Sequence, residues 1–480
     1  MTETILAPAE LPSAEEPKQS PAEQSPAEQR PVEQRKDQGK ALRQACPRAS
    51  HSTLGPDDPA RDPLALIDES NHDRLKMLLP VRYTRMMESE FAFFRGTATV
   101  QAHDLRDTPT SGIQVQCCGD CHLMNFGGFA TPERTMVFDI NDFDETHEGP
   151  FEWDLKRLTA SLVLAARWRS FSDDEAKAAA RSAVAAYRTT MDELSTASLL
   201  ETWYARITLD DVLKMTADDP ALQKRLKKAL KKARQNTSEH VFEKITKVVN
   251  GTPRIVTQPP LLFRSENYET NMKETVRPFF QGYRDTLTRD RQKLFDRYRI
   301  VDAAYKVVGV GSVGTRCFIA LLMGMQDDPL FLQVKEARRS VLEKHVGRPS
   351  HAHDGERVVS GQRMMQASSD IFLGWARGPK GRTYYVRQLR DMKYTPDLSQ
   401  HTPAILAAYG RLCGATLARA HARTGDAATI SGYLGSNDTF DEALCEYSVA
   451  YAERVERDFK VFQTAVRAGR FPLETSPMPR

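Results

Sequence analysis

The chain has 480 residues, of which 40% are hydrophobic and 27% charged, and its 67 basic residues nearly balance 64 acidic ones. This balance gives no reason to expect a nucleic-acid partner, and the composition is ordinary for a globular protein. No apolar stretch approaches the roughly 18 residues of a membrane helix, and seven cysteines behind a polar start do not suggest secreted disulfides. We therefore expect a soluble cytoplasmic protein without membrane contacts.

Residues 1–60 carry three near-copies of a five-residue unit, PAEQS, PAEQR and PVEQR, in a background of Pro, Glu, Gln and Ser. Such a segment buries too little apolar surface to offset the entropy of the chain. The sequence therefore predicts a disordered tail. Helical periodicity then begins and runs through Met86, Phe91 and Phe94.

The run CCGDCHLMNFGGF and the later run MVFDINDFDE carry the most informative polar residues. Asp120 and Asn125 lie five positions apart, and Asp139, Asp142 and Asp144 follow at the end of an apolar strand. A carboxylate, an amide and further carboxylates place a general base and hard oxygen ligands around one point, as magnesium-dependent phosphoryl transfer needs. The structural alternative for the later acids is a capped turn before a helix.

We expect Asp120 to be the catalytic acid or base and Asn125 to hold magnesium with Asp142. Asp139 is the expected second ligand or orienting residue. The next segment, 150–300, is predicted to be mostly helical. Its basic run, 224–234, indicates either a solvated helix face or an anionic partner, and the solvated face is the simpler reading.

From Tyr305 onward, β-branched residues and glycines predict a small antiparallel sheet. Gly309, Gly311 and Gly314 form a GxGxxG motif, and the residues after it read as a strand rather than the helix of a dinucleotide fold. A glycine turn between strands suits a flap over phosphates, although an ordinary hairpin has the same pattern. Lys335 ends the next strand, where it can neutralise phosphates or be a solvated edge charge.

The rest of the chain completes this expected site. A helix from about residue 355 carries Glu356 and Gln362, either of which can anchor the lysine. Later, His421 is expected to close an apolar helix that supports the loop of Asp120.

Four neighbouring residues allow a different interpretation. A C-x-x-C motif with an adjacent histidine can supply thiolate and imidazole ligands to zinc. The residues concerned are Cys117, Cys118, Cys121 and His122. No second, separated ligand pair is evident in the sequence, which argues against a structural zinc site.

The acidic loop resembles the HGDxHxxN loop of aminoglycoside and choline kinases, with Cys118 in the place of the first histidine. In the same way, Asp142 in DFDE resembles the metal-binding acid of IDFDD, and Asp154 in WDLKR resembles the structural acid of YDLAR. Over residues 60 to 470, motifs including VGVGSVGTR, LQVKEA and ARAHARTGD resemble the bacterial DUF2252 family, whose name supplies no activity.

The kinase resemblance implies an inverted order of parts, because the acidic loop precedes the glycine motif. It also implies that the strand 382–390 forms a hinge that receives adenine. The implied fold is α+β, a circularly permuted kinase-like two-lobe fold with a small antiparallel β lobe and a large helical lobe. The expected divisions are a tail (1–60), a large lobe with the catalytic loop (61–300), a nucleotide-binding lobe (301–395) and C-terminal helices on the large lobe (396–480).

The expected function is phosphoryl transfer from ATP, with Mg²⁺, to a hydroxyl of a small molecule or a protein. Two alternatives stay open at this point. The same cradle can serve a nucleotide-binding regulator without turnover or a nucleotidyl transferase, and a non-enzymatic helical scaffold can carry a Cys/His metal site.

Overall fold

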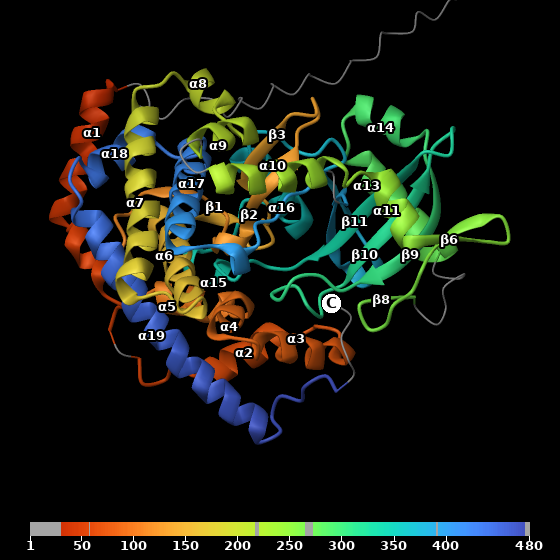
Figure 1. Ribbon diagram of the computed structural model, residues 1–480, viewed down its shortest axis with the longest axis horizontal. Coiled ribbons are helices and arrows are strands. Elements are labelled where there is room, and N and C mark those ends of the chain that lie inside the picture. Colours follow the sequence, from red (N-terminus) through yellow and green to blue (C-terminus); the bar gives the residue numbers. More distant parts are fainter. Residues whose placement is uncertain (1–29, 57, 217–219, 265–271, 390–391, 476–480) are drawn as a thin grey trace, which may run out of the picture.

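The computed structural model describes residues 30–56, 58–216, 220–264, 272–389 and 392–475. Figure 1 shows helices at one end of the molecule and a twisted sheet at the other. Helices and antiparallel sheets together confirm the α+β class. Within these ranges, no helix combines the length and the apolarity needed to cross a membrane.

The largest sheet has six antiparallel strands, with the glycine motif on one of its turns. In spatial order the strands are β12 (Gly374–Arg377), β13 (Thr383–Gln388), β11 (Pro329–Ala337), β10 (Cys317–Met323), β9 (Arg299–Lys306) and β8 (Leu262–Phe263). The segment between β9 and β10 turns through Gly309 and Gly314, whose φ angles of 60° and 89° favour glycine. The motif is therefore a turn between two paired strands, as predicted, and no helix follows it directly.

Both faces of this sheet are buried. Leu322 of β10 contacts an apolar cluster that includes residues of α13 (Arg277–Asp285), whereas Leu321 contacts another that includes a residue of α11 (Ser238–Ile245). Burial on both faces explains why the β10 run CFIALLM is continuously apolar. Three further elements precede β9, namely β6 (Thr246–Val249), β7 (Thr252–Ile255) and α14 (Arg289–Phe295).

The segment from residue 238 to β9 thus covers or flanks the sheet rather than completing the helical part. The predicted boundary at residue 300 is too late, and it falls inside β9. The physical reason is that a two-sided sheet needs apolar helices on both faces, and the chain supplies them before the strands they cover.

Long helices form the other end of the molecule. α17 lies along α7, and α19 packs against α6 and α7, so the C-terminal helices contact helices from the middle of the chain (Figure 1). Their bounds are α6 (Phe151–Trp168), α7 (Asp173–Ser195), α17 (Pro403–Ala422) and α19 (Thr439–Arg467). The shorter helices are α2 (Pro63–Asn71), α3 (Leu79–Met86), α4 (Glu90–Gly96), α5 (Ala98–Leu105), α8 (Leu199–Tyr204), α9 (Leu209–Met215) and α10 (Pro220–Arg234).

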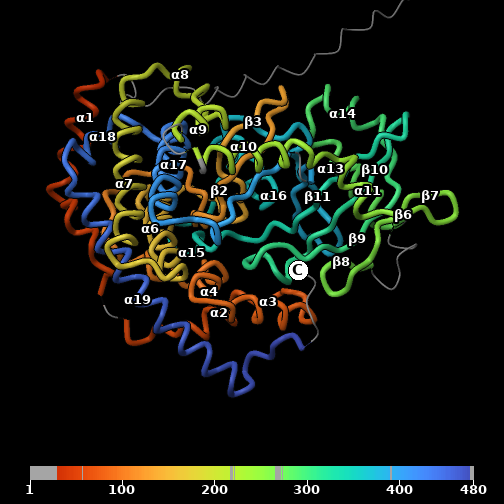
Figure 2. The backbone as a smooth tube through the Cα atoms, viewed as in Figure 1, coloured from red at the N-terminus to blue at the C-terminus, as the bar shows by residue number. Residues whose placement is uncertain are grey.

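The predicted tail is partly an ordered helix. Residues 1–29 lie outside the described residues, but α1 (Val32–Ala41) packs beside α18 (Ala427–Leu434), as Figure 2 shows. A Cβ added to Gly39 would lie 2.0 Å from a backbone oxygen of α18, so the two helices meet through their backbones. The tail prediction is wrong from residue 30, because α1 packs through a glycine rather than through an apolar stripe.

Short strands carry the acidic segments between the two ends (Figure 1). β1 pairs with β4, and the hairpin of β2 and β3 is extended by β5. Their bounds are β1 (Gln114–Cys117), β2 (Phe126–Ala130), β3 (Met136–Ile140), β4 (His147–Pro150) and β5 (Ile207–Thr208). Backbone hydrogen bonds of 2.9 and 2.7 Å between Gly128 and Tyr394 join β2 to the segment after the large sheet.

Candidate active site

Asp120 and Asn125 lie on the loop after β1, and hydrogen bonds within the loop hold them together. Nδ2 of Asn125 and the backbone N–H of His122 each donate to the carbonyl of Asp120 at 2.8 Å. Gly119 has a φ of 83°, and a Cβ there would lie 2.1 Å from the carbonyl oxygen of Glu145. Glycine is therefore required at this position for the loop to close.

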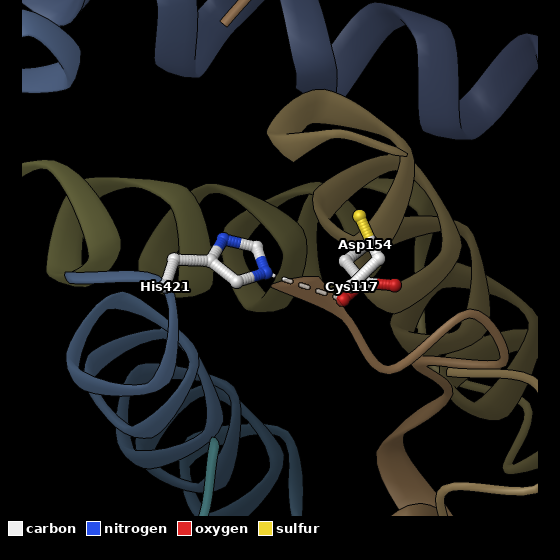
Figure 3. A group of neighbouring side chains, drawn as sticks. All are labelled: Cys117, Asp154 and His421. Carbon is white, nitrogen blue, oxygen red and sulfur yellow. Dashed lines mark hydrogen bonds and ion pairs between the residues drawn. The ribbon is translucent and has the colours of Figure 1, made fainter. Parts of the chain in front are cut away.

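The loop is supported from behind by Asp154 of α6. Its two carboxylate oxygens accept the backbone N–H groups of Cys118 at 2.7 Å and Gly119 at 3.0 Å. Nε2 of His421, on α17, lies 3.2 Å from the same carboxylate (Figure 3), and the hydroxyl of Tyr187 lies 2.9 Å from the other ring nitrogen. Asp154 and His421 thus occupy the supporting positions that the sequence predicts.

The four candidate zinc ligands do not form one set. Within the described ranges, possible ligand atoms approach within 4.8 Å in two groups, Cys117 with Asp154 and His421, and Cys118 with Cys121 and Asp154. His122 belongs to neither group. Burial raises the pKa of Cys118 to about 12, and the shared carboxylate already accepts backbone hydrogen bonds. These features favour a packing role for the cysteines.

Asp120 is oriented by an arginine that sequence reasoning missed. Arg157 donates to Oδ1 of Asp120 at 2.8 Å, to Gln101 at 2.9 Å and to the carbonyl of Phe94 at 2.9 Å. Oδ2 of Asp120 faces Nε2 of His122 at 3.9 Å. The helical spacing of three between Asp154 and Arg157 was the available signal, since it puts both on one face toward the loop.

The structure separates Asp139 from the other acids. Its side chain is buried, Nη2 of Arg419 lies 2.5 Å from one oxygen, and the backbone N–H of Ala367 donates to the other at 2.9 Å. It lines neither cavity described below, so its carboxylate holds α17 to the hairpin of β2 and β3.

Lys335 of β11 joins the sheet to the acidic segment. Its Nζ lies 2.6 Å from Asp144 and 3.6 Å from Asp142, and the hydroxyl of Tyr385 donates to the second oxygen of Asp144 at 2.6 Å. Burial lowers the pKa of Lys335, but the two carboxylates outweigh it and hold that pKa well above its ordinary value. Burial raises the pKa of Asp144, but the charge and the hydrogen bond of Lys335 outweigh burial, so this pKa lies below its ordinary value. The pair is therefore charged.

The expected anchors of this lysine have other partners. Glu356, at the start of α16 (Asp354–Met365), lies 3.9 Å from His351, and Gln362 donates to Gln366 at 2.9 Å. The structure pairs the lysine with Asp144 instead, at 2.6 Å.

The glycine loop, residues 307–316, is held by arginines from the N-terminal helices. Arg82 donates to the carbonyl of Gly311 at 3.1 Å, and Arg85 donates to that of Gly309. The hydroxyl of Ser312, at the middle of the loop, lies 3.3 Å from the carboxylate paired with the lysine. The loop thus lies over the ion pair with its carbonyls tied to α3.

Two cavities meet beside this ion pair. One, of about 850 Å³, is lined by Lys335 and Gln362 among others. Of the expected hinge, residues 387–389 line this cavity, Arg382 and Thr383 line the other, and Arg390 lies outside the described residues. The other, of about 1060 Å³, is lined by Asp120 and His122. The residues that line both are Arg95, Asn125, Asp142, Gly309 and Ser312.

Glu145 gives the second cavity a group that titrates near neutrality. Its Oε2 accepts the backbone N–H of Val341 at 2.7 Å, and it lies against Gly119 of the loop. Burial raises its pKa to about 7. The Glu145 carboxyl therefore changes charge near neutral pH, and it lies next to the loop that bears Asp120.

Comparison with known proteins places the chain in one family. No curated protein and no solved structure matches it. A family model described as an uncharacterised protein conserved in bacteria, DUF2252, matches residues 74–465, which include every residue that lines both cavities. The chain therefore belongs to the DUF2252 family.

Proposed function

We propose that this protein is an ATP- and magnesium-dependent phosphotransferase of the kinase-like type, acting on a hydroxyl group. The observation that carries the proposal is the ion pair between Lys335 and Asp144, residues 191 positions apart. A glycine loop, a buried lysine and a carboxylate cluster converge on it, and polyphosphate transfer needs these three parts at one point.

The oxygen donors beside the ion pair fit magnesium, which prefers carboxylate and amide oxygens. Asn125 and Asp142 both line the junction of the cavities, and the side chain of Asp142 is 32% exposed. Of Asp142 and Asp144, which follow β3, Asp144 is less available to a metal ion, because its oxygens contact Lys335 and Tyr385. We therefore assign the metal to Asn125 and Asp142, with Asp144 behind them, and no longer to Asp139.

The adenosine half of ATP is assigned to the cavity lined by residues 387–389, and the acceptor to the cavity at Asp120. In the reaction, the acceptor oxygen bonds to the γ-phosphorus while the bond to the β–γ bridging oxygen breaks. The hydroxyl proton passes to Asp120, and ADP leaves. Arg157 keeps one oxygen of Asp120 occupied, which leaves Oδ2 to receive the proton.

The order of elements supports a permuted kinase-like arrangement. Strand β9, the glycine loop, β10, β11 with Lys335, α16, β12 and β13 follow in the order of a kinase small lobe, and the loop of Asp120 precedes them in sequence. α17 ends beside the Asp120 loop through His421, so the helix that would precede this loop in a kinase is next to it in space.

The test is the melting temperature with and without millimolar ATP and magnesium, for wild type, Lys335→Ala and the exposed control Lys293→Ala. Binding at one hundred times Kd stabilises by about 2.7 kcal/mol, so wild type and the control should melt higher with ligand and Lys335→Ala much less so. A wild type that does not respond to ATP with magnesium refutes the proposal.

Turnover is tested separately with Asp120→Asn. We expect this variant to keep the ATP-dependent rise in melting temperature and to lose ATP consumption. Retained consumption would remove Asp120 from the reaction. Absent consumption in wild type, with binding intact, would favour a nucleotide-binding regulator, and release of pyrophosphate would favour a nucleotidyl transferase.

A further inference from the structure

Arg95 of α4 stands at the junction of the two cavities. It lines both, together with Asn125 and Asp142, and its backbone carbonyl lies 3.3 Å from the position of a Cβ added to Gly311. The glycine loop therefore packs directly on this residue. Arg95 thus lines the cavity that holds Asp120 and also the junction that holds the proposed metal ligands.

The guanidinium of Arg95 has an N–H group that makes no hydrogen bond within the described residues. Its Nε is buried and has no hydrogen-bond partner within the described part of the chain. The guanidinium carbon lies 5.8 Å from the centroid of the Phe91 ring. A buried N–H without a partner is destabilising, so a ligand that accepts this hydrogen bond is favoured there. The neighbouring Arg157, by contrast, spends its donors on Asp120, Gln101 and Phe94.

Two opposing effects act on the charged form of Arg95. Burial lowers its pKa, and the charge of Asp120 acts in the opposite direction. Because Arg157 already occupies Oδ1 of Asp120, the guanidinium of Arg95 is available to an incoming anion. A planar guanidinium matches the geometry of a phosphoryl group better than any other side chain.

We propose that Arg95 is a catalytic residue that contacts the γ-phosphoryl group of bound ATP. This inference rests on the proposed function, since it places the γ-phosphate between Asn125, Asp142 and Asp120. It adds a role that the sequence motifs do not indicate. Contact with the transferred group stabilises the charge that it carries during transfer.

The test compares the affinities for ADP and for the non-hydrolysable ATP analogue AMPPNP, each with magnesium, measured by calorimetry. In wild type the analogue should bind more tightly. In Arg95→Gln this preference should fall about tenfold or more while the ADP affinity changes less than about twofold, since a charge-assisted hydrogen bond is lost. Arg95→Lys should recover part of the preference, and the exposed Arg467→Gln should behave as wild type.

The outcomes separate the two proposals. If wild type binds neither nucleotide, the proposed function fails and this inference falls with it. If wild type binds ADP but shows no preference for the analogue, or if Arg95→Gln keeps the wild-type preference, Arg95 does not contact the γ-phosphoryl group although the nucleotide site stands. Should Arg95→Gln not fold, Arg95→Lys decides, because a preference unchanged by loss of the planar guanidinium also overturns the inference.

Discussion

Removing the lysine of the central ion pair should destabilise the protein by an amount that depends on its partner. Lys335 is 2% exposed and Asp144 is 25% exposed, so Lys335→Met leaves a largely buried carboxylate without its cation. Loss of one member of a buried pair costs about 3–5 kcal/mol, and the partial exposure of Asp144 points to about 3 kcal/mol. Asp144→Asn alone should cost about 2 kcal/mol, because Asp142 still faces the lysine at 3.6 Å.

The double variant measures the interaction energy between Lys335 and Asp144 separately from the effect of each single substitution. Once Lys335→Met is present, Asp144→Asn should cost little or restore stability, which gives a coupling of about 2 kcal/mol in urea unfolding.

The pH dependence of the stability has a defined sign. In wild type the lowered pKa of Asp144 adds stability above its unfolded value of 3.8, and this is lost as pH falls through the lower folded value.

In Lys335→Met, burial is left to raise the pKa of Asp144, so acid relieves the penalty instead of removing a benefit. The stability gap between wild type and this variant should therefore narrow from pH 7 toward pH 4. Single variants that add to within about 0.5 kcal/mol, or a gap that does not change with pH, would refute the assignment of the ion pair.

Three further outcomes follow from the contacts around the site. The free energy of unfolding of Glu145→Gln, relative to wild type, should rise by up to about 3 kcal/mol from pH 4.5 to above pH 7, because the raised pKa of about 7 penalises the charged carboxylate in folded wild type. A stability difference between the two proteins that is the same at pH 5 and pH 8 in urea unfolding would contradict this. Asp154→Asn should cost about 2–3 kcal/mol and speed hydrogen exchange of the two amides it accepts, at Cys118 and Gly119; unchanged exchange would count against its supporting role. Arg82→Gln should speed exchange across the glycine loop, because a loop carbonyl loses its donor, and equal protection in both proteins would show that the loop holds itself.

The predictable parts of the site are those whose backbone shape demands a residue type. The turn at Gly309 and the strand that ends near Lys335 could be predicted because glycine spacing and β-branched runs reflect local conformation. Asp154 was predictable from its motif. The different surroundings of Asp139 and Asp142 were not predictable, because they depend on Arg419, which pairs with Asp139, and on Lys335, which faces Asp142, and both lie far away in the sequence.

The missed residues share a different property. Arg82 and Arg85 bind backbone carbonyls of the glycine loop, and carbonyls are present at every position, so no pattern of side chains marks them. The ordered helix α1 was missed for a related reason. Its contact runs through the backbone at Gly39 and an ion pair between Arg35 and Asp426 at 2.5 Å, which composition reads as a polar tail.

Charge balance at the junction links the two proposed ligands to each other. Lys335 and Arg387 lie beside Asp142 and Asp144. Burial lowers the pKa of each cation, but Tyr385 and the two carboxylates outweigh burial and raise that pKa. Two cations and two carboxylates leave the cluster near neutrality. A polyphosphate arriving alone adds several negative charges beside the carboxylates, and a divalent cation arriving alone adds positive charge beside the lysine. Each ligand therefore offsets the charge that opposes the other, so magnesium should raise the affinity for ATP and ATP should raise the affinity for magnesium by the same factor.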